Sequence, residues 1–162
     1  MNQSLETYLN HHLHGFSKAL VLLDRLASRE PLADDHPQFR SVRDEVAGEF
    51  NFLRGLIESA DLQENKVVDY RKLAEIPENE ELHHQAHDSF AHLEMLEALV
   101  LTIQSKRLLW KALEAIQPQI PGWKNVDFSQ LERSAIRQRD GLEARRLHHV
   151  HEAFWTLLAQ AS

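Results

Sequence analysis

The stretch LETYLNHHLHGFSKALVLL, residues 5–23, carries apolar residues at intervals of three and four. An α-helix turns about 100° per residue, so this spacing places those residues on one face of a helix. The apolar positions are Leu5, Leu9, Leu13, Phe16, Leu20 and Leu23. The stretch therefore predicts an amphipathic helix from about Ser4 to Ala27 that turns one face toward a core.

The same periodicity predicts a second helix, which ends at about Ala60. Asp35 reads as its N-cap, because Gln38 follows three residues later in a capping-box pattern and Pro37 lies in the first turn. Periodicity then fades over residues 61–77, where we expect a surface loop or a short extra helix.

A third helix is predicted to start near Asn79 and to end at QPQIPG, residues 117–122. A single helix of this length would be unusually long beside its partners, so we expect a bend near Gln104 or Ser105.

A last helix is predicted from Asp127, where Gln130 completes a second capping-box pattern, to Leu158. No strand-like alternation bounded by turn dipeptides occurs in the chain. The sequence therefore predicts an all-α protein, an up-and-down four-helix bundle that forms one domain over residues 1–162.

Composition narrows the function classes. The chain has 162 residues and no cysteine, which excludes disulfides and thiolate metal sites. A net charge of −7 argues against general nucleic-acid binding, because phosphate contacts need a basic surface. The polar start does not resemble a signal peptide, and the longest apolar run is too short to span a membrane. We therefore expect a cytoplasmic protein with no membrane or nucleic-acid partner.

Histidine is the unusual component, since ten of the eleven histidines fall in three clusters on the first, third and last predicted helices. On a helical projection one polar residue of each helix lies in or beside the apolar stripe and so faces the core. These residues are His12, Glu49, Glu97 and His149. Unpaired burial of such groups is costly, so we expect them to pair with one another, with water or with a metal. The four residues form the predicted metal site, with iron, manganese and zinc as candidate ions. The alternatives are a hydrogen-bonded network without metal and side chains at the stripe edge that reach solvent.

This plan of four helices with inward Glu and His resembles the ferritin-like superfamily. Its di-iron members carry Glu-x-x-His motifs, and the sequence has Glu80-x-x-His83 and Glu81-x-x-His84 at one helix start. In the last helix Arg146 stands where the His after Glu143 would be expected. The resemblance therefore implies a ferritin-like bundle, non-catalytic or weakly metal-binding, that forms a homo-oligomer.

The helix plan is also similar to that of hemerythrin-like proteins. The matching residues, in chain order, are His12 or His14, His83-x-x-x-His87 and His148-x-x-x-Glu152. On the second helix Glu45-x-x-x-Glu49 stands where that family has a histidine and a glutamate.

A third resemblance is local and concerns residues 11–15. His11-x-Leu13-x-Gly15 is similar to the histidine-phosphotransfer signature, with His11 as the phosphoryl acceptor. This resemblance implies a signalling or adaptor bundle that acts through a protein partner, which is the alternative function. No nucleophile elbow, phosphate loop or zinc-protease motif occurs, so the sequence favours a non-catalytic protein over an enzyme.

Overall fold

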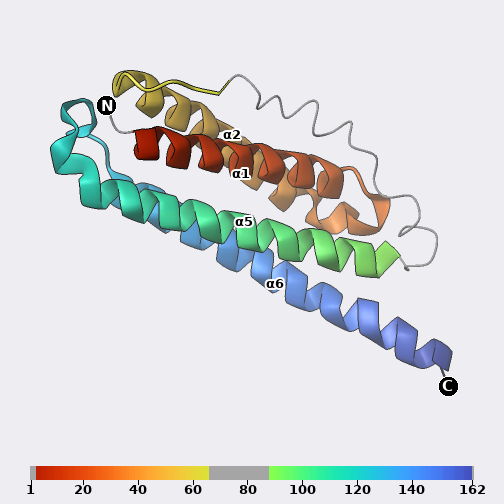
Figure 1. The fold of residues 1–162 in the computed structure, drawn as a ribbon. Coiled ribbons are helices and arrows are strands. Elements are labelled where there is room, and N and C mark those ends of the chain that lie inside the picture. Colours follow the sequence, from red (N-terminus) through yellow and green to blue (C-terminus); the bar gives the residue numbers. More distant parts are fainter. Residues whose placement is uncertain (1–2, 66–87, 162) are drawn as a thin grey trace.

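Four long helices make up most of the part of the chain that the structure describes, and the prediction of an all-α fold is confirmed. The structure, a computed structural model, describes residues 3–65 and 88–161, and within these ranges it contains no strand. The helices are α1 (Gln3–Ala27), α2 (His36–Ser59), α5 (Asp88–Ile116) and α6 (Phe128–Ala161) (Figure 1). The short 3₁₀ helices are η1 (Glu30–Asp35), η2 (Gln117–Gln119) and η3 (Pro121–Trp123). The predicted start of the third helix, near Asn79, lies outside the described residues.

The four helices lie side by side as two antiparallel pairs. Figure 1 shows α1 running against α2, and α5 running against α6. It also shows α2 and α5 running in the same direction. The expected up-and-down order requires strict alternation, so the directions of these four helices differ from it. The pair α1 and α2 contacts the pair α5 and α6 mainly through α1 and α5.

A single hydrophobic cluster draws buried residues from all four helices. Its largest members include Trp110 and Trp123, both 0% exposed, whose rings each contact that of Phe128. The Trp123 Nε1–H donates to the carbonyl of Leu56 at 3.2 Å, so this end of the bundle satisfies the polar edge of the buried ring. In contrast, Trp155 near the end of α6 is 73% exposed.

The two predicted N-caps have different outcomes. The Asp127 carboxylate accepts the backbone N–H of Gln130 at 2.9 Å, as predicted. Asp35 makes no side-chain cap hydrogen bond, so the capping-box prediction at the start of α2 is wrong. The physical reason is competition, because the Asp35 carboxylate is taken by Arg145 and His149 of α6.

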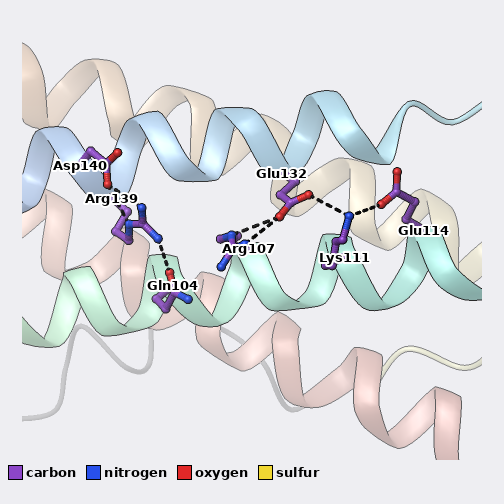
Figure 2. Close-up of polar contacts among 7 residues, drawn as sticks. All are labelled: Gln104, Arg107, Lys111, Glu114, Glu132, Arg139 and Asp140. Carbon is purple, nitrogen blue, oxygen red and sulfur yellow. Dashed lines mark hydrogen bonds and ion pairs between the residues drawn. The ribbon is translucent and has the colours of Figure 1, made fainter.

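Helix α5 is continuous, so the predicted bend near Gln104 or Ser105 is wrong. No glycine or proline occurs between residues 88 and 116 to interrupt the hydrogen-bond ladder. Polar pairs also join residues 104–111 of this helix to α6, as Figure 2 shows for Arg107 and Lys111, which both contact Glu132. Such partly exposed pairs each contribute little to stability, but together they fix the alignment of the two helices.

No helix in residues 3–65 and 88–161 is both long and apolar enough to cross a membrane.

Candidate functional site

The centre of the bundle holds an ionic network built around one lysine. Lys106 of α5 is only 3% exposed, and its Nζ donates to carboxylate oxygen Oε2 of Glu49 on α2 and to the amide oxygen of Gln138 on α6. Glu49 and Gln138 are themselves 8% and 4% exposed. Three helices that are distant in sequence are thus joined through one ammonium group.

The amide nitrogen of Gln138 extends the network toward the surface. It donates to Glu45 Oε2 at 2.7 Å and lies 3.3 Å from Glu49 Oε1. Glu45 and Glu49 are one helical turn apart on α2, so both carboxylates present oxygen atoms to the same side chain. Gln138 therefore accepts from the ammonium and donates to the two acids, which makes it the bridge of the network.

Burial and pairing act in opposite directions on the pKa of Lys106. Removal of the ammonium from water lowers the pKa, and the Glu49 carboxylate opposes that fall by stabilising the charged form. The Phe16 ring also presents its face to the ammonium, with Nζ 5.8 Å from the ring centroid. The site is an almost water-free ion pair whose two partners depend on each other.

His12 of α1 lies close to this network across a small cavity. The cavity has a volume of about 10 Å³, and its lining includes His12, Phe16, Ser105 and Lys106. A volume of this size has room for about one water molecule. The His12 ring packs edge-on against Tyr8 at 4.6 Å between centroids. Burial, with a smaller contribution from His11, lowers the pKa of His12 to about 4.

A second polar cluster joins the start of α2 to the far part of α6. The two ring nitrogens of His149 lie 3.0 Å from Asp35 Oδ2 and 2.9 Å from Glu152 Oε2. Arg145 contacts the other oxygen of Asp35 at 3.1 Å, and its Nε donates to the Gln38 amide oxygen at 2.8 Å. Asp35 and Gln38, predicted as a capping box, instead hold α6 against the start of α2.

The four residues predicted to share a metal site lie in different surroundings. His12, Glu49 and His149 are buried, at 7%, 8% and 5% exposure. Glu97 is exposed, so its predicted inward position is wrong. It lies near Arg146, whose pKa it helps to raise, on the solvent side of α5 and α6. Glu49 pairs with Lys106 and His149 pairs with Asp35, so the structure does not bring these two together.

The donor set of the interior does not fit a metal centre of the kind that the ferritin-like resemblance implies. Across residues 3–65 and 88–161, no group of three or more His, Asp or Glu side chains is arranged to hold a metal ion. Glu49, the buried carboxylate of the predicted site, already accepts from the Lys106 ammonium through its Oε2. A fixed positive charge in this position repels a divalent cation.

The other predicted pairs also have definite positions. His148 and Glu152 are exposed on one face of α6, with His148 Nε2 3.9 Å from Glu152 Oε1. His11 is exposed on α1, and its ring lies edge-on to that of His12. The predicted site at His83 and His87 and both Glu-x-x-His motifs lie outside the described residues.

Sequence reasoning missed Lys106 and Gln138, although a signal for both is present. Lys106 continues the apolar stripe of Leu99 and Ile103 toward Trp110 at helical spacing. Gln138 lies between Ala135 and Leu142 in the same way on α6, and all three are buried. A polar residue within a buried stripe predicts a polar partner, for Lys106 and Gln138 as for His12 and His149.

Comparison of the chain with protein-family models, with curated proteins and with solved structures finds no match.

Proposed function

We propose that this protein is a non-catalytic helical bundle of ferritin-like plan that acts by binding and uses no internal metal. The observation that carries this proposal is the position of the Lys106 ammonium between Glu49 and Gln138. In a metal-binding bundle a cation joins the inward carboxylates of several helices. Here a side chain of the protein supplies that positive charge.

The order of helix directions supports the ferritin-like part of the proposal. Two antiparallel pairs, with α2 and α5 running in the same direction, are expected of a bundle that contains one long crossover connection. The homo-oligomer implied by the same resemblance stays a prediction.

Melting temperatures measured with and without metal ions test this function. A ligand that binds the native state raises the melting temperature, so Mn²⁺, Fe²⁺ or Zn²⁺ should give no increase over EDTA that depends on Glu49. The matched variants are Glu49→Gln in the network and Glu58→Gln, an exposed residue of the same helix. A metal-induced rise that Glu58→Gln retains and Glu49→Gln abolishes would contradict the proposal.

The exposure of His11 favours one alternative, a histidine-phosphotransfer role. The imidazole is accessible on α1, and Gly15, one turn further along, adds no side chain beside it. In the transfer step, a ring nitrogen of neutral His11 attacks the phosphorus of a partner's aspartyl phosphate. The P–N bond forms as the P–O bond to the aspartate breaks, and the carboxylate leaves.

Incubation with a phosphorylated response regulator tests this alternative, with phosphohistidine detected by mass spectrometry. Phosphate should appear on His11, disappear in His11→Gln and persist in His14→Gln, a control on the same exposed side of α1. Absence of phosphohistidine in the unmodified protein would remove the alternative and leave the metal-free bundle unaffected.

A further inference from the structure

A groove with basic edges lies between α1 and α5, on the outer side of the cavity next to Lys106. It has a volume of about 450 Å³. From α1 it is lined by His11, His14 and Lys18, and from α5 by Ala98, Leu101 and Ser105. Its inner wall includes His12, Gly15 and Thr102, which also line the small cavity. The groove therefore opens to solvent on one side and reaches toward the ionic network on the other.

The charge of the groove is the opposite of that of the whole protein. The chain has a net charge of −7, yet none of the described carboxylates lines the groove. Its polar lining comprises imidazole and ammonium groups on one face of α1, since residues 11, 14 and 18 follow helical spacing. Lys18 is exposed and forms no ion pair with any described residue. An anion would therefore find uncompensated donors there.

The α5 side of the groove is apolar at Ala98 and Leu101, and its polar members are the hydroxyl residues Thr102 and Ser105. Leu101 is 65% exposed, which is unusual for a large aliphatic side chain, and Ala98 lies one turn before it. The hydroxyl of Thr102 donates to the Ala98 carbonyl at 2.8 Å, which satisfies its hydrogen-bonding requirement within the helix. This wall suits a hydrocarbon chain better than a polar ligand.

Gly15 keeps the groove open. A Cβ built at Gly15 would meet only the Thr102 methyl carbon Cγ2, at an ordinary 3.9 Å. Helix packing therefore does not require glycine at this position, although alanine would be better for the helix by about 1 kcal/mol. A side chain at residue 15 would instead reduce the space between the basic and the apolar walls.

From this juxtaposition we propose that the groove binds a free amphipathic carboxylate with a short alkyl chain. The carboxylate lies among His11, His14 and Lys18, and the chain lies along Ala98 and Leu101. The lining residues of α5, from Ala98 to Ser105, span about 10 Å of helix axis, which matches an alkyl carboxylate of about eight carbons. The inference names a ligand class for the proposed binding role and rests on it.

Titration of the full chain with octanoate, followed by ¹H–¹⁵N correlation NMR, tests the proposal. Saturable shifts should be confined to residues 11–18 and 98–105, with a dissociation constant below about 1 mM. Octanol lacks the charge and acetate lacks the chain, so each should bind at least about tenfold more weakly.

Matched variants separate the two walls from general surface effects. Lys18→Glu and Leu101→Gln should each weaken octanoate binding at least about tenfold, whereas Lys124→Glu and Leu108→Gln, both exposed and outside the groove, should leave it unchanged. Gly15→Ala should weaken binding while the melting temperature is maintained or rises.

Three results would overturn the proposal. They are the absence of saturable shifts, equal affinity for octanol or acetate, and a concentration-dependent dimer that Leu101→Gln disrupts and octanoate does not affect. The last result would show that a second copy of the chain occupies the groove. None of these results alters the melting temperatures measured with metal ions and with EDTA. Failure of octanoate binding can therefore be distinguished from failure of the proposed metal-free bundle.

Discussion

Lys106 illustrates how a charged residue is accommodated at the centre of an apolar helix face. Its position in the stripe is set by the spacing of Leu99, Ile103 and Trp110, and its stability there depends on Glu49. An isolated ammonium in this place would be strongly disfavoured, because burial removes its hydration. The pair therefore acts as a unit, in which removal of one member leaves a buried charge behind.

Replacement of Lys106 by methionine should destabilise the protein by about 3–5 kcal/mol, because the Glu49 carboxylate loses its partner in the core. The double variant Lys106→Met with Glu49→Met should lose less than the sum of the two single changes, by more than about 1 kcal/mol. Urea unfolding of the four proteins provides the measurement. Additive losses would mean that the two side chains are energetically independent.

His12 gives the protein a defined sensitivity to acid. Because its folded pKa is about 4, below the value of about 6.5 in an unfolded chain, the unfolded state binds the proton more readily. The stabilising contribution of neutral His12 is complete above the unfolded value and is lost as pH falls from there toward the folded pKa. Between pH 7 and pH 5 this loss is at most about 2 kcal/mol.

Unfolding measured across this pH range, at fixed salt, tests the assignment to His12. The variant His12→Leu should show a weaker dependence on pH, while His14→Gln, an exposed control, should behave like the unmodified protein. An identical pH dependence in all three proteins would show that the acid sensitivity arises elsewhere.

At the scale of helices, the glycines of α2 are not explained by close packing. A Cβ at Gly48 or at Gly55 would meet no atom of the described residues within 4 Å, so neither glycine is needed for contact between the described helices. Gly122 differs, because a Cβ there would lie 3.0 Å from the backbone oxygen of Ser59. All three positions are glycine in the sequence. Only the packing around them shows that Gly122 is needed for a close contact and that Gly48 and Gly55 are not.

The change of Gly48 or Gly55 to alanine should stabilise the protein by about 0.5–1 kcal/mol each, since alanine loses less backbone entropy in a helix. Gly122→Ala should give no gain or a loss, because the backbone of Ser59 would have to move. Denaturant unfolding distinguishes the variants. A destabilised Gly48→Ala would indicate that this face of α2 is covered in solution.

Helix positions were largely predictable, because apolar spacing reports on burial directly. The predicted limits of the first, second and last helices agree closely with α1, α2 and α6. Helix ends were less predictable where a polar residue has two possible uses. Asp35 could cap α2 or pair with α6, and the sequence contains no information on which partner is near.

For the whole molecule, apolar spacing predicts which polar residues are buried, but it does not predict which of them contact one another. The predicted inward positions of His12, Glu49 and His149 are confirmed, yet each has a different partner. Grouping depends on the order and direction of the helices, which the spacing of apolar residues does not encode. Lys106, the partner of Glu49, is not among the predicted site residues, and Asp35, the partner of His149, is predicted as an N-cap.

We propose that Lys106, and not a metal ion, balances the carboxylate charge in the interior of this bundle. Elemental mass spectrometry of protein purified without a histidine tag tests it most directly, with Glu49→Gln measured in parallel. Iron, manganese and zinc should each be present at far below one ion per chain in both proteins. One ion per chain in the unmodified protein, lost in Glu49→Gln, would contradict it.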